Sequence, residues 1–540
     1  MTTPTTPERT GQRPGGIRWW PAALVLAGSG GVLFWNRVIR AAAGQDRFLT
    51  GAITVGVTTI LLLLWVALLS RMRWRSRLVI VVGALVVVGT GFATLRVGDV
   101  SGDLVPILSW KWSGEPSVDM QVPLAEASSL SSSARSSSAA GSGLPPLAGL
   151  ADYPQFLGPD RNATVAGVRL AQDWQVHPPR EAWRRPVGAG YSAFSVSGRR
   201  AITQEQRGEQ ETVVCYDIST GEVLWSHADN ARYESTIGGV GPRATPAIVD
   251  GRVYSFGATG LLNCLDLRTG ERLWGRNAVE DAGAKINSWG MSGSPLVLGR
   301  RVVINGGGRE GKSLAAYDHL TGELVWSGGD DSASYSSPML AVFAAMEQIV
   351  ILNDHSVVGH DPATGSVLWS HPWSGKQPKV AQPLGLPGDR LFASSGYSVG
   401  GASLRISRDV DSETGWSVQR EWQTSRMKAK FANMAYRDGH IYGFDDGILA
   451  SVNAATGERN WKRGRYGHGQ LILVGDVLLV TSESGEIVLV EASPQRHREV
   501  ARFEVLDDKT WNSPALAGRH LLVRNHREAV CLELAVEEGP

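Results

Sequence analysis

A short motif recurs along the chain: an Asp or Asn, a Thr-Gly pair three residues later, and a Trp four residues after the glycine. Asp and Thr side chains hydrogen-bond the backbone of tight turns, and Gly adopts the positive φ that closes them. Each copy therefore predicts a strand, a turn and a second strand that ends in Trp. The first copy contains Asp217, Thr220-Gly221 and Trp225. Further copies end at Trp274, Trp326, Trp369 and Trp461, and a degenerate copy ends at Trp422.

The spacing of the copies predicts a β-propeller. Trp225, Trp274, Trp326 and Trp369 are 49, 52 and 43 residues apart, which is typical of four-stranded propeller blades. A second hairpin signal precedes most copies, as at Asp250-Gly251. We therefore predict an all-β propeller with eight blades over residues 181–534, or seven if the degenerate units merge.

The two ends of the repeat region are complementary. Residues 181–187 look like an outer strand without a preceding blade, and the last unit runs out near Leu534 without an outer strand. We predict that the first segment completes the last blade and closes the ring. Because each sheet buries both faces against its neighbours, the indoles should fill the gaps between blades. The tryptophans to which we assign this structural docking role are Trp183, Trp225, Trp274, Trp326, Trp369, Trp422 and Trp461.

Three apolar stretches precede the repeats, at residues 19–39, 48–70 and 78–97, each close to the ~20 residues that a membrane-spanning helix needs. The arginines of the N-terminal tail and of residues 71–77 should stay in the cytoplasm. Three crossings then place the propeller in the periplasm or outside the cell. Since no span contains Asp, Glu, Lys or His, we interpret them as an anchor in the inner (cytoplasmic) membrane. A signal peptide cleaved near Ala41-Ala42-Ala43 is the alternative for the first stretch.

Residues 98–150 separate the anchor from the repeats, and from about Ser113 they are dense in Ser, Ala, Gly and Pro. Such a segment buries too little apolar surface to fold, so we expect a flexible linker. The predicted organisation is a cytoplasmic tail at residues 1–18, an anchor at 19–97, the linker at 98–150 and the propeller at 151–540.

Charge and cysteine content narrow the function. A formal charge of +1 argues against nucleic acid as a partner. We assign no catalytic residue and no metal site. Cys215, Cys264 and Cys531 occupy one repeat position in neighbouring blades. Stacked sheets lie ~10 Å apart, whereas a disulfide needs Cα atoms within ~7 Å. We therefore predict three free, buried thiols.

The functional surface of a propeller is usually its axial mouth, where loops lead into the inner strands. Cationic side chains in these loops would suit an anionic ligand as charge-assisted donors. The alternative is that each of them is a solvated loop residue. The candidates for binding at the axial mouth are Arg207, Arg243, Lys312, His355 and Lys430.

The Asp-x-x-Thr-Gly-x-x-x-Trp unit resembles the tryptophan-docking repeat of pyrroloquinoline quinone (PQQ)-type propellers over residues 152–534. That superfamily contains quinone-dependent alcohol and sugar dehydrogenases, and also non-enzymatic relatives such as the lipoprotein that helps insert outer-membrane barrels. The resemblance implies a quinoprotein dehydrogenase-like propeller of eight blades, here preceded by three transmembrane α-helices.

Three departures favour the non-enzymatic branch. The adjacent cysteine pair of the alcohol dehydrogenases and a haem-attachment motif are absent, and few long insertions are present to roof a cofactor. The resulting hypothesis is a binding or scaffolding module for an envelope protein, peptide or glycan. The alternative is a PQQ-dependent membrane-bound alcohol or sugar dehydrogenase, and we expect PQQ and calcium only in that case.

Overall fold

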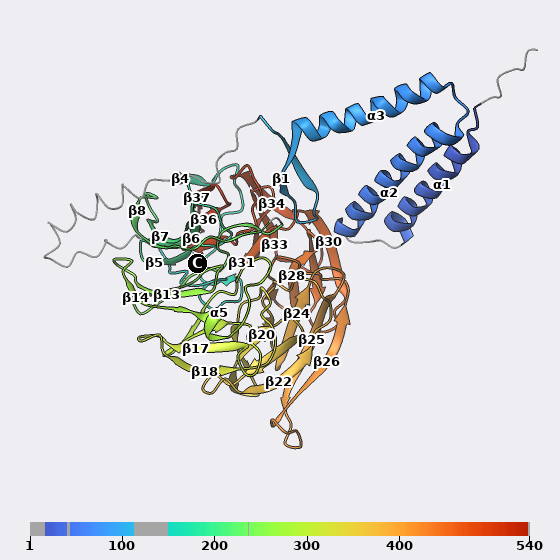
Figure 1. Cartoon of the computed structure of the whole chain (residues 1–540). Helices are drawn as coiled ribbons and strands as arrows, with labels where there is room; N and C mark the ends of the chain where they lie inside the picture. Colours follow the sequence, from blue (N-terminus) through green and yellow to red (C-terminus); the bar gives the residue numbers. More distant parts are fainter. Residues whose placement is uncertain (1–16, 40–43, 113–149, 236, 538–540) are drawn as a thin grey trace, which may run out of the picture. The chain divides into compact units, whose positions relative to one another are not determined.

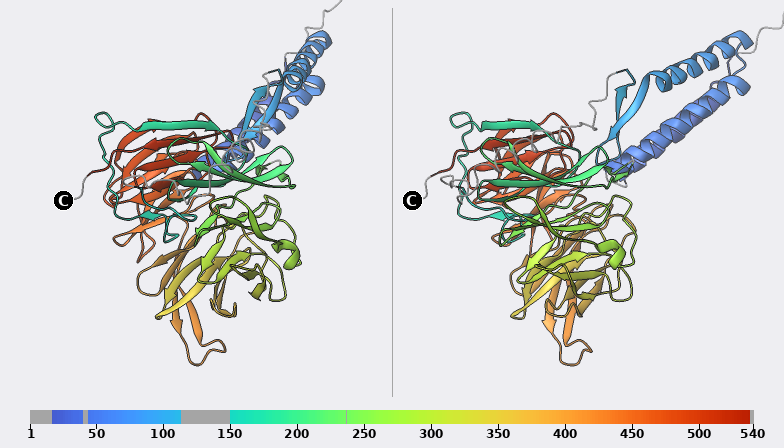
Figure 2. Two further views of the ribbon diagram at one scale, coloured as in Figure 1. Left: turned by 90° about the vertical axis from the view of Figure 1, so that its left-hand side faces the viewer. Right: turned by 60° about the vertical axis from the view of Figure 1, so that its left-hand side comes forward.

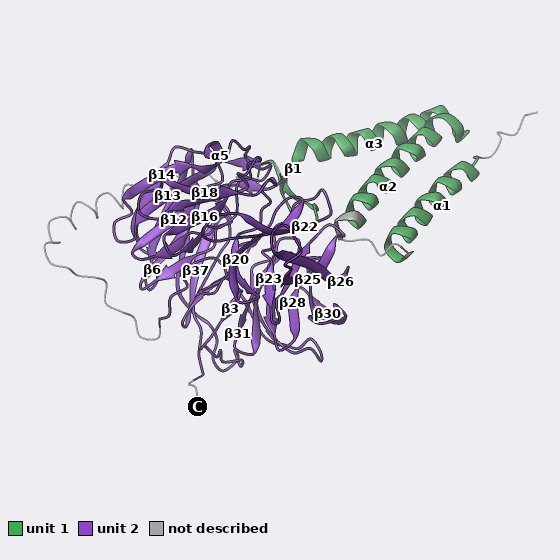
Figure 3. Ribbon diagram, turned by 90° about the horizontal axis from the view of Figure 1, so that it is seen from below, with its two compact units in different colours: residues 1–115 green, residues 116–540 purple. Residues whose placement is uncertain are grey.

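The computed structural model describes residues 17–39, 44–112, 150–235 and 237–537. The chain divides into two compact units, Met1–Glu115 and Pro116–Pro540 (Figure 3), and each is described by itself.

The first unit contains helices and one hairpin. Helix α1 (Trp20–Phe34) continues as a π-helical turn η1 (Trp35–Ile39), α2 (Gly44–Leu64) continues as η2 (Trp65–Leu69), and α3 spans Trp74–Thr94. Strands β1 (Leu95–Val100) and β2 (Pro106–Trp110) pair antiparallel. This hairpin overlaps the start of the predicted linker, and residues 113–149 of that linker lie outside the described ones.

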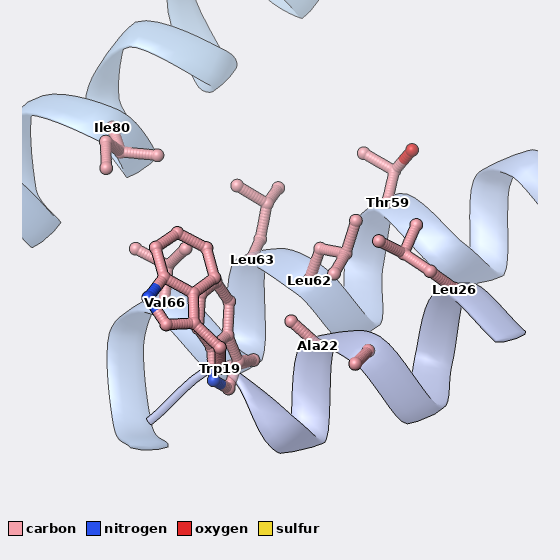
Figure 4. Close-up of a pocket in the computed structure, with 10 residues that line it drawn as sticks. Trp19, Ala22, Leu26, Thr59, Leu62, Leu63, Val66 and Ile80 are labelled. Atoms are coloured by element: carbon pink, nitrogen blue, oxygen red, sulfur yellow. The ribbon is translucent and has the colours of Figure 1, made fainter. Parts of the chain in front are cut away.

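Helix α1 packs against α2. The hydroxyl oxygens of Ser29 and Thr58 are 2.5 Å apart, and the rings of Trp19 and Trp65 are 5.4 Å apart. An apolar pocket of about 490 Å³ lies between the helices (Figure 4). It is lined by Trp19, Ala22, Ala23, Leu26, Thr59, Leu62, Leu63, Trp65, Val66 and Ile80.

Two of the three predicted membrane spans correspond to candidate helices. The helices Arg47–Leu69 and Trp74–Thr94 are long and apolar enough to cross a membrane by length and composition. The first stretch, residues 19–39, is not among the helices apolar enough to cross a membrane, because Asn36 and Arg37 end its apolar part. The prediction of three transmembrane helices is therefore corrected to two candidates.

The second unit consists of eight sheets that follow one another along the chain. Figure 1 shows them in order from green through yellow and orange to red, and Figure 2 gives two further views. Seven sheets have four antiparallel propeller strands in chain order, and the eighth takes its outer strand from before blade 1. The first strands of most neighbouring blades contact one another. The first strands therefore line a central channel, and the prediction of an eight-bladed, all-β propeller is confirmed.

The strands are β5 (Ser195–Ser197), β6 (Arg200–Arg207), β7 (Gln210–Asp217) and β8 (Val223–Asp229) in blade 1; β11 (Ala247–Val249), β12 (Arg252–Phe256), β13 (Leu261–Asp266) and β14 (Arg272–Asn277) in blade 2; β15 (Leu296–Leu298), β16 (Arg301–Asn305), β17 (Leu314–Asp318) and β18 (Leu324–Gly328) in blade 3; β19 (Met339–Phe343), β20 (Met346–Leu352), β21 (Ser356–His360) and β22 (Val367–Pro372) in blade 4; β23 (Leu384–Leu386), β24 (Arg390–Ser395), β25 (Gly400–Arg408) and β26 (Trp416–Thr424) in blade 5; β27 (Ala435–Arg437), β28 (His440–Asp445), β29 (Ile448–Asn453) and β30 (Arg459–Arg465) in blade 6; β31 (Gln470–Val474), β32 (Val477–Thr481), β33 (Glu486–Glu491) and β34 (Glu499–Glu504) in blade 7; and β35 (Ala515–Ala517), β36 (His520–Arg524), β37 (Glu528–Glu533) and β4 (Arg180–Pro186) in blade 8. Between blades lie the short hairpin β9 (Glu234–Ser235) and β10 (Gly239–Val240), and the helical turn α5 (Ala278–Asp281).

Strand β4 closes the ring, as the sequence predicts. It pairs antiparallel with β37, with Trp183 opposite Cys531, and lies beside β36 and β37 in Figure 1. A buried arginine reinforces this closure from the last blade. Arg524, on β36, donates to Thr203 Oγ1 at 2.8 Å and to the carbonyl of Gly188 at 2.8 Å.

A segment before the ring, residues 153–165, crosses one end of the channel. The backbone of Tyr153 pairs with Val196 in blade 1, and strand β3 (Thr164–Val165) pairs parallel with β31 in blade 7. Between these points Arg161 donates to the carbonyls of Ser294 and Pro295, at 3.1 and 2.9 Å, beside the inner strand of blade 3. Because blades 3 and 7 are opposite each other in a ring of eight, the segment spans the channel.

Six of the seven docking tryptophans contact the turn of the next blade. The indole N–H of Trp183 donates to the carbonyl of Ile218 at 2.7 Å, and that of Trp225 donates to the carbonyl of Leu267 at 3.0 Å. The ring lies against the glycine of the same turn: a Cβ at Gly221 would be 2.6 Å from the Trp183 ring. Five of the seven tryptophans are buried, whereas Trp274 and Trp422 are half-buried.

The docking contact changes at the degenerate blades. A Cβ at Gly415 would meet no atom of the described residues within 4 Å, and the indole of Trp369 instead donates to Gln348 Oε1 in its own blade, at 2.6 Å. Blade 7 has lost its Thr-Gly pair, and Trp461 donates to the carbonyl of Ser493 at 2.9 Å while its ring meets His497 edge-on at 5.5 Å.

The cysteine prediction is confirmed, since Cys215, Cys264 and Cys531 are free and buried. Each lies opposite a docking tryptophan across the sheet, and burial raises the pKa of the Cys531 thiol to about 12. These thiols are therefore protonated and shielded at neutral pH.

A matched pair of glycine substitutions tests the docking contact. In Gly270→Ala the new methyl would lie 2.4 Å from the Trp225 ring at a φ of +74°, so we expect a loss of about 2–4 kcal/mol from backbone strain and overpacking together. Gly415→Ala has the same backbone strain without the clash, and should cost only about 1–2 kcal/mol. Guanidinium unfolding of the full-length protein measures both losses, and equal losses would rule out the docking role.

Candidate functional site

A belt of polar side chains surrounds the channel where the chain enters each inner strand. The backbone N–H of Ala193 donates to Thr245 Oγ1 at 3.2 Å, that of Thr245 to Ser294 Oγ at 2.9 Å, and that of Ser294 to Ser337 Oγ at 2.9 Å. Each bond thus joins one blade to the same position of the next. The equivalent residues of blades 1 to 8 are Ala193, Thr245, Ser294, Ser337, Gln382, Asn433, Gln470 and Ser513.

Two residues before the belt, the chain passes the mouth of the channel. This mouth position holds an aromatic ring in most blades. The residues there are Tyr191, Arg243, Ser292, Tyr335, Val380, Phe431, His468 and Trp511.

The rings at the mouth contact one another across the channel. Phe431 of blade 6 lies 5.0 Å from Trp511 of blade 8 and 6.0 Å from Trp289, which precedes blade 3. Trp511 also lies 5.4 Å from Tyr191, and Trp289 lies 5.2 Å from Tyr335. We call these five half-buried residues the aromatic cluster. Since blades 3 and 6 are on different sides of the ring, the cluster bridges the mouth.

Cationic side chains lie over the ring faces at the mouth. Lys430 Nζ is 5.4 Å from the centre of the Phe431 ring, and Lys509 Nζ is 4.3 Å from that of Trp511. Their exposed fractions are only 3% and 5%. Arg243 lies over Tyr191 at 5.5 Å. Cations are attracted to the negative faces of aromatic rings, by about 0.5–2 kcal/mol each.

One carboxylate is fixed among these groups. Glu483 Oε1 accepts from the indole N–H of Trp511 at 2.9 Å, and its Oε2 accepts from the backbone N–H of His468 at 3.0 Å. Glu483 therefore orients a ring of the aromatic cluster.

Arg243 also organises a loop. Its guanidinium donates to the carbonyls of Gly241 and Gly239, at 2.6 and 3.2 Å, and to that of Gly238. Burial lowers its pKa, and the neighbouring tyrosines and Glu211 act in the opposite direction. The arginine thus holds the loop that contains β9 and β10 against the mouth.

The contacts of the described residues do not link the other three predicted site residues directly to the aromatic cluster. Arg207 ends β6 and is buried, with its Nε 2.9 Å from Glu205 Oε2, so it is not a loop residue. Lys312 is exposed in the loop between β16 and β17. His355 is exposed after β20 and pairs with Asp331 at 2.9 Å. The structure therefore brings together Arg243 and Lys430 of the five predicted residues, through Tyr191, Trp511 and Phe431.

Sequence reasoning missed the aromatic cluster and two buried lysines. The two lysines are Lys509 and Lys379. Lys379 is 1% exposed, and its Nζ lies 3.1 Å from Asp354 Oδ1. A signal was present, since five belt residues precede Pro and the mouth position is always two residues upstream. These pairs are Thr245-Pro246, Ser294-Pro295, Ser337-Pro338, Gln382-Pro383 and Ser513-Pro514.

One sequence pattern resembles a catalytic motif. Gly396-Tyr397-Ser398-Val399-Gly400 matches Gly-x-Ser-x-Gly. It forms the turn between β24 and β25, however, and Ser398 is exposed there, whereas the hydrolase motif requires a strand followed by a helix. The pattern is therefore a hairpin turn.

The geometry does not fit a planar quinone cofactor well. A flat ring system held at the mouth would have to separate Phe431 from Trp511 and from Trp289. The ring of Phe431 contacts both of these rings directly. Within the described ranges, no group of three or more His, Cys, Asp or Glu side chains is arranged to hold a metal ion.

Comparison with known proteins gives one family, and the relatives include BamB proteins and quinoproteins. The family model described as outer membrane protein assembly factor BamB matches residues 171–288 and 209–463, which together cover more than half of the chain. BamB of Shewanella oneidensis is 21% identical over 354 residues, which is 62% of this chain and 84% of that protein.

The quinoprotein relatives match a smaller part of the chain. Quinohemoprotein alcohol dehydrogenase ADH IIB of Pseudomonas putida is 28% identical over 143 residues, or 24% of this chain. The chain spans only 19% of the length of that curated relative. The solved structure of quinohemoprotein alcohol dehydrogenase from Comamonas testosteroni has a TM-score of 0.51 at 14% identity, over 72% of this chain and 81% of that one. This last similarity shows the fold alone.

A buried carboxyl next to the mouth makes stability depend on pH. Burial raises the pKa of Glu211 to about 7, although its Oε1 accepts from the backbone N–H of Ala258 at 2.7 Å. Between the unfolded value near 4.5 and pH 7, unfolding releases a proton, so stability falls as the pH rises.

The substitution Glu211→Gln should remove this dependence. We expect the wild type to lose roughly 1–3 kcal/mol between pH 4.5 and pH 8 through this group, and the variant to lose correspondingly less. Chemical unfolding at several pH values measures the difference. Parallel curves for the two proteins would contradict the assignment.

Proposed function

Because the chain belongs to the PQQ-like repeat family described as outer membrane protein assembly factor BamB, we propose that it is a membrane-anchored binding or scaffolding module of the cell envelope. The observation that carries this proposal is the axial mouth, where an aromatic cluster and three cations gather on a rigid ring. Aromatic residues and arginine are enriched at protein recognition surfaces. The partner is accordingly an envelope protein.

Two observations favour binding over the quinone-dependent alternative. Phe431 contacts Trp289 and Trp511 across the mouth, and a planar cofactor bound there would have to part these rings. The alignment with BamB of Shewanella oneidensis also extends over most of that protein, whereas the alignment with ADH IIB covers about a fifth of the enzyme.

The arginines between the two candidate spans support export of the propeller. Arg71, Arg73, Arg75 and Arg77 lie at the turn between η2 and α3 or in its first residues. By the positive-inside bias this turn is cytoplasmic. The residues after α3 then emerge on the other side of the inner membrane, whether or not α1 crosses it.

Affinity capture from native membranes tests the binding role. The full-length wild type should recover an envelope protein reproducibly, and Lys430→Gln/Lys509→Gln should recover much less because the charge at the mouth is lost. Lys312→Gln/Lys285→Gln is the matched control, since it removes two exposed loop cations. Equal recovery by all three proteins would place the binding surface away from the mouth. Tight uptake of PQQ and calcium, with dye reduction by an alcohol or sugar, would support the dehydrogenase instead.

Thiol labelling tests the topology. Val410 is 94% exposed, whereas the three native cysteines are 0% exposed, so a membrane-impermeant maleimide should label Val410→Cys and spare the wild type. Labelling on intact spheroplasts is expected for an exported propeller. Labelling of Val410→Cys only after lysis would contradict export.

A further inference from the structure

The hairpin of strands β1 and β2 follows directly after helix α3 and turns away from the helix axis (Figure 1). The backbone N–H of Lys111, just past β2, donates to the carbonyl of Thr94 at 2.8 Å, and its Nζ donates to the carbonyl of Phe92 at 2.7 Å. Both acceptors lie in the last turn of α3. The open end of the hairpin is therefore fixed to the end of a helix that is long and apolar enough to cross a membrane.

One face of the hairpin carries apolar side chains along its length. Opposed residues of an antiparallel pair have their side chains on the same face, and successive residues of a strand alternate between faces. Three opposed pairs share this face: Leu95 with Trp110, Val97 with Leu108, and Val100 with Pro106. We call it the apolar face. Val97 is 60% exposed, Leu108 57% and Trp110 52%, so little of the described chain covers it.

The opposite face is more polar. Arg96 and Ser109 are opposed there, and Arg96 Nε donates to Ser109 Oγ at 3.3 Å. Ile107 also lies on this face. An exposed apolar face backed by a polar one is the pattern of a segment that lies in a membrane interface. A two-stranded hairpin is only marginally stable alone in water, so covering the apolar face would stabilise it.

Two tryptophans lie where the hairpin meets the helix. The rings of Trp110 and Trp112 stack at 5.0 Å, and Trp112 is 67% exposed. Tryptophan is enriched at membrane–water interfaces, because its ring is apolar and its N–H is polar. Trp74 begins α3 and is also exposed. The 21 residues of α3 extend about 31 Å, close to a hydrocarbon core of ~30 Å. Tryptophans therefore mark both ends of a segment as long as one membrane crossing.

We propose that the β1–β2 hairpin lies in the outer interface of the membrane that α3 crosses, with its apolar face and the stacked tryptophans toward the lipid. The occupant of the apolar face is thus a lipid surface, and the face of Arg96 and Ser109 is toward water. This inference rests on the membrane-anchored part of the proposed function and adds a second contact with the bilayer. The linker to the propeller then begins at the membrane surface.

Spin-label depth measurements test the proposal on the full-length protein in liposomes of phosphatidylethanolamine with a smaller share of phosphatidylglycerol. A nitroxide is attached at Leu108→Cys, on the apolar face, and in a second variant at Ile107→Cys, on the other face. Oxygen concentrates in the bilayer and a nickel chelate stays in water, so the ratio of their collision rates reports depth. We expect this ratio to be at least about threefold higher at residue 108, since an interfacial segment buries its apolar face ~5–10 Å deep.

Reference positions calibrate the scale. A nitroxide at Leu85→Cys, near the middle of α3, should show a high ratio, and one at Val410→Cys, in an exposed propeller loop, a low ratio. The wild type should take up no label, because its three cysteines are buried. Removal of both rings in Trp110→Ala/Trp112→Ala should lower the ratio at residue 108 at least about twofold, because the interfacial anchors are lost.

Equal ratios at residues 107 and 108, or a ratio at residue 108 as low as at residue 410, would overturn the proposal. Low collision rates with both reagents at residue 108 would also overturn it, because a protein surface would then cover the apolar face. An unchanged ratio in the tryptophan variant would contradict the place of these rings in the interface.

The label at residue 85 separates failure of this proposal from failure of the proposed anchor. If that label collides mainly with oxygen while the label at residue 108 collides with the nickel chelate, α3 crosses the bilayer and only the hairpin proposal is wrong. If the label at residue 85 collides mainly with the nickel chelate, the anchor itself is wrong.

Discussion

The contact between a tryptophan and the glycine of the next turn is the interaction on which the propeller depends. One glycine closes the turn with a positive φ and also leaves room for the indole, as Gly221 does for Trp183. The indole N–H then binds a carbonyl of that same turn. Turn geometry, apolar burial and hydrogen bonding are thus satisfied by one pair of residues. Since each blade contacts only its neighbours, this pair fixes the rotation from blade to blade.

A ring of such contacts tolerates local defects because it is closed. Trp369 has lost its glycine partner and turns to Gln348, and Trp461 uses Ser493 where the Thr-Gly pair is missing. Neither change opens the ring, since β4 completes blade 8 through a full ladder of backbone pairs. Arg524 adds buried hydrogen bonds between the last blade and residues of the first. Closure therefore compensates for the individual docking contacts that have been lost.

The fold was predictable from the sequence because its determinants repeat at fixed spacing. The eight blades, the closing strand at Trp183 and the buried thiols follow from the place of each residue within the repeat. The apolar length of the first helix was overestimated, because Asn36 and Arg37 shorten its apolar part. The segment at residues 153–165 that crosses the channel was not predicted. Its only strand is two residues long, and its position depends on contacts with several distant blades.

The candidate site was predicted only in part, for a related reason. Arg243 and Lys430 stood out as loop cations, but the residue at the mouth position differs from blade to blade. Of Tyr191, Phe431 and Trp511, only Trp511 lies two residues before a belt residue that precedes Pro. Their contacts arise only when the ring closes and brings loops from different blades to one axis. Arg207 was expected at the mouth as a cationic loop residue. It lies instead at the end of β6, where its side chain is buried and pairs with Glu205.

The closed ring also separates the charge of the mouth from that of the whole molecule. A chain with nearly equal numbers of acidic and basic residues exerts little long-range attraction, and at physiological salt any field fades within ~8 Å. The cations at the mouth are held against ring faces by short contacts, such as that of Lys509 with Trp511, so their effect is strong only on a ligand that already touches the cluster. Under the proposed binding function, recognition at this site would be governed by fit and local charge, and not by steering from a distance.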